Sequence, residues 1–212
     1  MVSPLGRAGP ALRAISCRHA VKPQPCTTWN YSNTNYVVLG LLIEKVTGGK
    51  YEQVVAQRVL RPLHLDETTF PGNDTEIRGP HAHSYGIVNG QPVDTTRWNP
   101  SVFWAAGDVI TTTKDLDTFY AALLTGKLLE PAQQTELTRT TPVSTDYGLG
   151  VFVEKAPCGT TIIGHPGGVP GFASYAYSTP DLKRRAEFSI STGVGTGDPT
   201  NAYNKLINEI FC

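Results

Sequence analysis

Two short motifs in this sequence carry side chains that could transfer protons or hold a small substrate. The tripeptide YSN at residues 31–33 stands directly before an apolar stretch, and GHPGG at residues 164–168 ends a run of β-forming residues. Tyr31 could transfer protons near neutral pH only beside a cationic group, because the ordinary pKa of tyrosine is about 10. The glycines after His165 would let a substrate backbone approach closely. Each motif alone also fits a plainer interpretation, a helix N-cap for the first and a β-turn for the second.

Histidines and aromatic residues form two weaker candidate sites. His81 and His83 are one residue apart, so on a strand both rings would lie on the same face and could share a metal ion. No carboxylate at helical spacing supports a metal site, and we expect an ordinary loop here and no metal. Trp104 lies near Trp98 and Phe103. This group fits a packed loop and an aromatic wall of a substrate cleft equally well.

The composition predicts one globular unit that acts on small molecules or peptides. The chain has 212 residues, of which 40% are hydrophobic, enough for one ordinary core. Its 18 basic and 18 acidic side chains give no net charge, so we expect no nucleic-acid partner and no attraction to an anionic membrane surface. The sequence has neither an apolar run of the length of a membrane span nor a secretory signal. We expect a monomer, and a cytoplasmic location for the chain as given.

Hydrophobic periodicity predicts helices in the first two-thirds of the chain. Apolar residues at helical spacing begin after Thr34 and stop at Gly48-Gly49, and a second helix over residues 51–60 ends before Pro62. A hairpin over residues 84–95 is predicted to turn at Asn89-Gly90. The segment TTKD at residues 112–115 is typical of a capping box and predicts a helix to residue 124. Residues 1–26 show no periodicity, and we assign them no element.

The last third of the chain predicts an antiparallel sheet covered by a helix. Strand-like runs occupy residues 148–153, 160–165, 172–178 and 186–192, with turn residues between them, and residues 200–211 form an amphipathic pattern. Helices first and a meander last indicate an α/β (α+β) fold in which a helical part is set off from the sheet.

The four cysteines lack the spacing of a zinc site or a redox dithiol. Cys158 lies in a turn between two predicted strands, and Cys212 follows the last predicted helix. These two could meet when the helix packs on the sheet, and a disulfide there would stabilise the fold by about 4 kcal/mol. Two buried free thiols are the alternative, and a reducing compartment favours them.

Taken with their flanks, the motifs resemble the serine hydrolases of the β-lactamase and penicillin-binding family. The closest resemblance is to the class C β-lactamases and the D-alanyl-D-alanine carboxypeptidases of actinomycete type. It covers residues 27–212 and rests on five pieces of sequence: TTWNYSNTNYVVLGLLIEKVTG, AAGDVITTTKDLDTFYAALLTGKLL, YGLGV, GHPGGVPGF and the terminal Phe-Cys. The resemblance implies an antiparallel sheet with flanking helices and a helical subdomain, in an exported protein without a cofactor.

The resemblance also implies roles for individual residues. In this family Ser-x-x-Lys opens a helix, Tyr-x-Asn follows on the helical domain, and Lys-Thr-Gly or His-Thr-Gly lines a strand. By resemblance Tyr31 shuttles the proton, Asn33 holds the substrate amide and His165 assists from the strand. The backbone N–H of Gly168 would donate in an oxyanion hole. Gly167 and Trp104 would contact the substrate, and Cys158 would pair with Cys212.

The sequence departs from the family at three places. The family places Ser-x-x-Lys well before the tyrosine, and this motif occurs nowhere in the sequence. We therefore expect residues 27–212 to be the C-terminal portion of an N-terminally truncated domain, and residues 1–26 to lie outside the family. Pro166 and Phe152 stand where the carboxypeptidases hold the substrate carboxylate with a hydroxyl and an arginine. This difference favours an ester or amide substrate.

These observations lead to two functional hypotheses. The first is a serine hydrolase whose full-length form works through an acyl-enzyme on β-lactams, D-Ala-D-Ala peptides or esters. This chain would be inactive by itself because the nucleophile is absent. The alternative is a pseudoenzyme that binds peptides or cell-wall fragments without turnover, in a cleft around Tyr31, Trp104 and His165.

Overall fold

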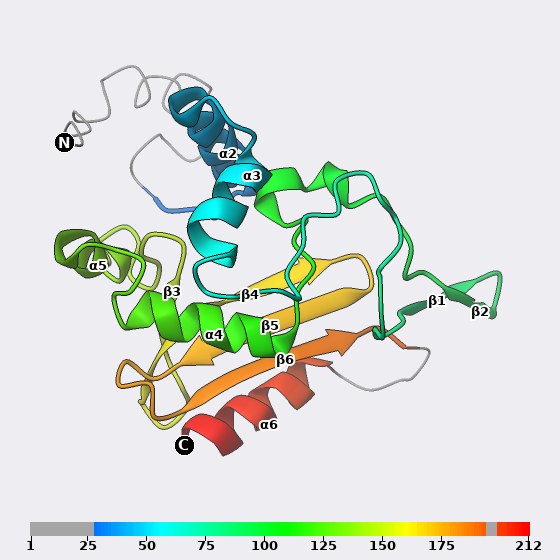
Figure 1. Ribbon diagram of the computed structural model, residues 1–212. Helices are drawn as coiled ribbons and strands as arrows, with labels where there is room; N and C mark the ends of the chain where they lie inside the picture. Colours follow the sequence, from blue (N-terminus) through cyan, green and yellow to red (C-terminus); the bar gives the residue numbers. More distant parts are fainter. Residues whose placement is uncertain (1–27, 194–198) are drawn as a thin grey trace.

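The fold is built on a four-stranded antiparallel sheet with helices on both faces (Figure 1). The computed structural model describes residues 28–193 and 199–212, so the prediction for residues 1–26 lies outside the described residues. The strands follow one another across the sheet in chain order: β3 (Phe152–Lys155), β4 (Thr161–Val169), β5 (Phe172–Ser178) and β6 (Arg185–Ser191). The expected α/β (α+β) arrangement, an antiparallel sheet with flanking helices, is confirmed.

The hydrophobic core lies on both faces of this sheet because successive strand residues point to opposite sides. Ile162 packs in one cluster with Ile207 and Phe211 of the last helix, α6 (Pro199–Phe211). The next residue along β4, Ile163, packs in a second cluster with Leu137 and with side chains of the helical layer on the other face. In Figure 1 the sheet accordingly lies between α6 and α4 (Thr113–Leu124).

Helix α2 (Asn33–Thr47) begins and ends where the sequence predicts. The side chain of Ser32 caps it by accepting a hydrogen bond from the Thr34 N–H at 3.3 Å, and Gly48 ends it in the left-handed conformation at φ 71°. Gly40 is its one buried residue and packs closely on the turn η3 (Trp104–Ala106). A Cβ at this position would lie 2.6 Å from the Cβ of Ala105, so only glycine fits. Five large apolar side chains of α2 are exposed: Val38, Leu39, Leu41, Leu42 and Val46.

The other predicted helices and the hairpin are also confirmed. Helix α3 (Tyr51–Val55) continues into the π-helical turn η1 (Ala56–Leu60). Helix α4 is capped by Thr112, whose side chain accepts the N–H of Asp115 at 3.2 Å. The hairpin pairs β1 (Tyr85–Val88) with β2 (Gln91–Asp94) and extends away from the main sheet (Figure 1). Two short 3₁₀ turns, η2 (Pro100–Val102) and η3 (Trp104–Ala106), precede α4.

Two strand ends differ from the prediction by several residues, and one helix was not predicted. Strand β3 begins at Phe152 rather than at residue 148, because Gly150 has a φ of 86° and the Gly148 N–H closes a turn onto the Val151 carbonyl. Strand β4 continues past His165 to Val169. Helix α5 (Pro131–Leu137) was not predicted, since its sequence PAQQTEL is short and mostly polar and gives little periodic signal.

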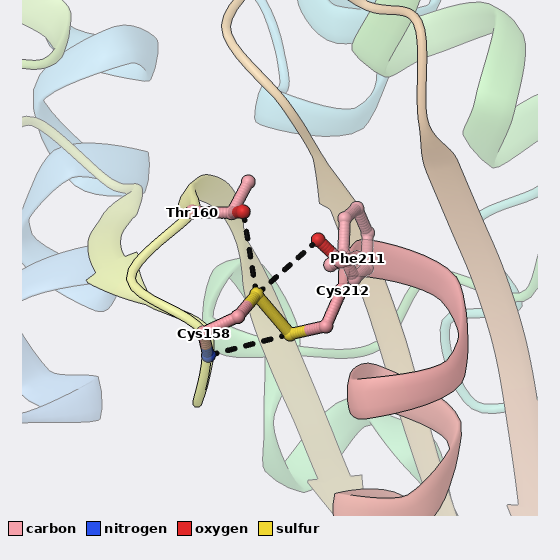
Figure 2. The surroundings of a disulfide bond; sticks show 4 residues. All are labelled: Cys158, Thr160, Phe211 and Cys212. Carbon is pink, nitrogen blue, oxygen red and sulfur yellow. Dashed lines mark hydrogen bonds between the residues drawn. A yellow bond between two sulfur atoms is a disulfide. The ribbon is translucent and has the colours of Figure 1, made fainter.

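A disulfide joins Cys158 to Cys212, so it links the turn between β3 and β4 to the end of α6 (Figure 2). The two Cα atoms are 5.7 Å apart, within the usual range for this bond. The Cys158 N–H points to Cys212 Sγ at 3.3 Å, and Phe211 beside it is fully buried. The alternative of two free thiols is not what the structure contains.

None of the helices within residues 28–193 and 199–212 has the length and apolar character needed to cross a membrane.

Candidate active site

The structure brings the two motifs together on the same side of the sheet. Ser32 caps α2, so the preceding Tyr31 stays outside the helix, and His165 lies on β4 one residue beyond the last residue that pairs with β3. The rings of Tyr31 and His165 have centroids 5.7 Å apart. Tyr31 is about one-third exposed, so its phenol remains within reach of solvent.

Tyr147 lies at the centre of an aromatic cluster around His165. Its ring centroid is 5.8 Å from that of His165, 5.9 Å from that of Tyr31 and 4.6 Å from that of Phe152. The ring of Trp29 lies 5.2 Å from that of Tyr147, with the two planes inclined by 36°. Tyr147 begins the segment YGLGV, which belongs to the family resemblance, but the sequence alone gives this residue no role. Its contact with His165 depends on the bend after Tyr147, which places the ring beside β4.

Hydrogen bonds fix the tautomer of His165. Its Nδ1 lies 2.5 Å from the carbonyl oxygen of Pro166, which can only accept, so Nδ1 carries the hydrogen. Nε2 then accepts a hydrogen bond from the Tyr147 hydroxyl at 3.1 Å. The hydroxyl of Tyr36 forms a hydrogen bond with that of Tyr147, so the three polar groups form one continuous chain. Burial lowers the pKa of His165 below its ordinary value, partly offset by the bond to Pro166. The imidazole is therefore neutral near pH 7.

The phenols of this cluster are also neutral. Burial raises the pKa of Tyr31, and the neighbouring Tyr36 raises it further. Burial likewise raises the pKa of Tyr147, and its hydrogen bond with Tyr36 acts in the same direction. A tyrosine with a raised pKa cannot take a proton from a nucleophile. Tyr31 would need an added cation beside it to become a base, as its chemistry predicts.

Strand β4 has an unpaired edge next to this cluster. Its pairing with β3 stops at Gly164, opposite Phe152, whereas its pairing with β5 continues to Val169. Residues 165–169 therefore have no described strand on the β3 side. Gly168 is exposed, and a Cβ on it would meet no atom within 4 Å. A substrate backbone could lie along this edge and reach backbone N–H groups.

The remaining predicted residues lie at different distances from the cluster. Asn33 is exposed at the first position of α2, two residues from Tyr31. Gly167 is exposed on β4 beside Gly168. Trp104 packs instead against α2 and α3: its indole N–H donates to Glu52 at 2.7 Å and its ring lies 5.6 Å from that of Tyr51. No contact within the described residues joins Trp104 to His165, so its place in a substrate cleft stays a prediction.

The part of the chain that the structure describes contains no cluster of three or more His, Cys, Asp and Glu side chains that could hold a metal ion. At the candidate site, Tyr31 and His165 are neutral hydrogen-bonding groups beside an open strand edge.

The family of the chain follows from its match to a known protein family. A family model described as Beta-lactamase matches residues 4–204. The chain belongs to the β-lactamase family. The resemblance found in the sequence is thus confirmed at the level of the family. The match begins inside the segment 1–26, which we expected to lie outside the family, and the position of that boundary stays a prediction.

Known relatives of this β-lactamase-family chain include penicillin-binding proteins and amidases. Penicillin-binding protein 4* of Bacillus subtilis is 26% identical over 166 residues, which are 71% of this chain and 37% of that protein. A D-stereospecific amidohydrolase from Streptomyces has a crystal structure that matches with a TM-score of 0.81 and 37% identity, over 92% of this chain and 58% of that one. The D-amino acid amidase of Ochrobactrum anthropi, complexed with D-phenylalanine, matches with a TM-score of 0.70 and 28% identity, over 91% and 59%.

The matched residues cover about a third of two penicillin-binding proteins of Bacillus subtilis and somewhat less than three-fifths of the two amidase structures.

Proposed function

We propose that this chain supplies the tyrosine, asparagine and histidine part of a serine amide-hydrolase site. The serine and lysine of Ser-x-x-Lys, absent from this sequence, would come from the remainder of a longer protein. In the complete site the serine attacks the amide carbonyl, the C–N bond breaks, and water then releases the acyl group from the serine. Tyr31 carries the proton from the serine to the leaving amine.

The observation that carries this proposal is the meeting of Tyr31 and His165 beside an unpaired edge of β4. The neutral state of the cluster is consistent with a missing lysine, because a cation near Tyr31 would lower the pKa of its phenol. Nε2 of His165 accepts a hydrogen bond from the Tyr147 hydroxyl, so this histidine is neutral and is not the cation that Tyr31 needs. Asn33 would hold the substrate amide, and the N–H of Gly168 would stabilise the oxyanion, an interaction worth about 3 kcal/mol in other enzymes.

The side chains around His165 favour an uncharged leaving group. The described groups in ring contact with it are Tyr31, Tyr147 and Phe152, and none of them is cationic. A substrate carboxylate placed here would lose hydration without gaining an ion pair, which is costly in a half-buried site. An amide has no such charge. Two structural relatives are an amidohydrolase and an amidase of D-amino acids, which supports amides of D-amino acids with apolar side chains as substrates.

A chimera tests this proposal. A segment that carries Ser-x-x-Lys, taken from an active member of the family, would be fused before residue 28, and hydrolysis of D-phenylalanine amide would be measured. We expect turnover by the chimera, a loss of 10²-fold or more with Tyr31→Phe on the order of general acid–base contributions, and none with alanine in place of the serine. A correctly folded chimera whose turnover is unaffected by Tyr31→Phe would refute the assignment.

The chain as printed provides the matching control. Without the nucleophile it should hydrolyse no D-phenylalanine amide and acquire no mass from a penicillin. A covalent adduct on the printed chain would contradict the proposal, because some other residue would then be the nucleophile.

A second candidate function is reversible binding without turnover. It is favoured by the accessible aromatic cluster, in which Trp29 and Tyr31 are both more than one-third exposed. Saturable binding of a D-amino-acid peptide to the printed chain, with no change in mass and with loss on Tyr31→Ala, would support it.

A further inference from the structure

His81 and His83 lie side by side at the base of the β1–β2 hairpin, away from the candidate active site. The two rings stack with centroids 4.8 Å apart and planes inclined by 20°. Both side chains are exposed. Because the rings stack, the two imidazoles share one face of the chain.

Each ring is fixed by a hydrogen bond from Nδ1. In His81 the partner is the backbone carbonyl of Gly79 at 2.8 Å, and in His83 it is a carboxylate oxygen of Asp94 at 2.7 Å. A carbonyl and a carboxylate can only accept, so Nδ1 carries a hydrogen in both rings. In the neutral imidazole Nε2 then presents a lone pair. No hydrogen bond within the described residues occupies either Nε2 atom.

Asp94 is held in place by the hairpin. It ends β2 opposite Tyr85 in the strand register, and its other carboxylate oxygen accepts the Thr96 N–H at 2.9 Å. The carboxylate therefore reaches His83 from the neighbouring strand. A histidine whose Nδ1 donates to a carboxylate or a carbonyl while Nε2 stays available is the usual arrangement of metal-binding histidines.

We propose that His81 and His83 bind one divalent transition-metal ion through their Nε2 atoms, with water completing its coordination. Imidazole pairs suit Zn²⁺, Ni²⁺ and Cu²⁺, and the general order of affinity places Cu²⁺ above Zn²⁺. The prediction of no metal from the sequence rested on the lack of a supporting carboxylate at helical spacing. Asp94 provides that support across the hairpin instead. The site is independent of the proposed hydrolase activity.

Titration calorimetry of the untagged chain with ZnCl₂ and with CuCl₂ tests the site. We expect saturable binding of one ion, tighter for Cu²⁺, and at least a tenfold loss of affinity with His81→Ala or His83→Ala. Asp94→Asn should weaken binding by about 10- to 100-fold, as do other changes to the hydrogen-bond partners of metal-binding histidines. His64→Ala is the matched control, because His64 is also exposed and contacts no ring among the described residues. The metal affinity of this variant should equal that of the wild-type chain.

Histidine NMR separates a metal site from an ordinary ion pair. Cu²⁺ at low occupancy should broaden the ring signals of His81 and His83 before those of His64, and both rings should carry the proton on Nδ1. A protonated His83 paired with Asp94, or equal Zn²⁺ affinity of the wild-type chain and the His81→Ala/His83→Ala variant, would overturn the proposal. Circular dichroism of each variant confirms that the fold is retained.

Discussion

The disulfide gives a prediction whose size follows from the chain itself. Cys158 and Cys212 are separated by 54 positions, so the bond closes a loop that holds β4, β5, β6 and α6. By the chain-entropy relation a loop of this length stabilises the folded state by about 4 kcal/mol. This is a large share of the stability of an ordinary domain, which is about 5–15 kcal/mol. The double variant Cys158→Ser/Cys212→Ser should lose most of that amount.

Guanidinium unfolding followed by circular dichroism measures this loss. With a slope of about 4 kcal/mol per molar, the midpoint of the double variant should fall by about 1 M, and the reduced wild-type chain should unfold at the same concentration as the variant. Cys17→Ser/Cys26→Ser is the matched control for the number of cysteines, and those positions lie outside the described residues. Equal midpoints for the oxidised and reduced wild-type chains would refute the loop-entropy argument. Four alkylated thiols in the untreated chain would refute the bond itself.

Three further predictions follow from the site and the surface. Tyr147→Phe removes the hydroxyl that Nε2 of His165 accepts, so the pKa of His165 should rise toward its ordinary 6.5 in an NMR titration and about 1 kcal/mol of stability should be lost. Burial raises the pKa of Glu187 from 4.5 to about 7, with a neighbouring carboxylate adding to the rise. The folded state therefore keeps the Glu187 proton to a higher pH than the unfolded state, so the free energy of unfolding falls as the pH rises from about 4.5 to about 7. Glu187→Gln should remove this part of the pH dependence, measured by urea unfolding at several pH values. Leu39 and Val46 are half or more exposed on α2, so Leu39→Glu/Val46→Lys should raise the soluble fraction after centrifugation and change stability by less than about 0.5 kcal/mol.

Most helices and turns could be predicted because their signals are local. Gly48 ends α2 in the left-handed conformation that a glycine favours, and Asn89-Gly90 adopts the positive φ angles of its hairpin turn. The start of β3 could not be predicted, because the same apolar run that suggests a strand is bent at Gly150. The bend is also held by a distant segment, since the Leu149 N–H donates to the Leu137 carbonyl of α5 at 2.9 Å.

The candidate site could be predicted only in part for a related reason. Tyr31 and His165 belong to recognisable motifs, whereas Tyr147 and Tyr36 matter through hydrogen bonds that depend on how distant segments pack. Asp94 supports His83 across a hairpin, so a search for carboxylates at helical spacing could not find it. A sequence pattern describes one segment at a time, so it does not predict which residues of neighbouring strands will lie side by side.

The electrostatic state of the cluster links the fold to the proposed chemistry. Burial acts on both Tyr31 and His165 in the direction that removes charge, raising the pKa of the phenol and lowering that of the imidazole. A cluster of neutral groups can position a substrate but cannot generate a base at neutral pH. One cation near Tyr31 would reverse this for the phenol, since an opposite charge within a few ångströms favours the ionised form. The lysine of Ser-x-x-Lys would bring that charge together with the nucleophile, so a single segment would supply both functions that the described residues lack.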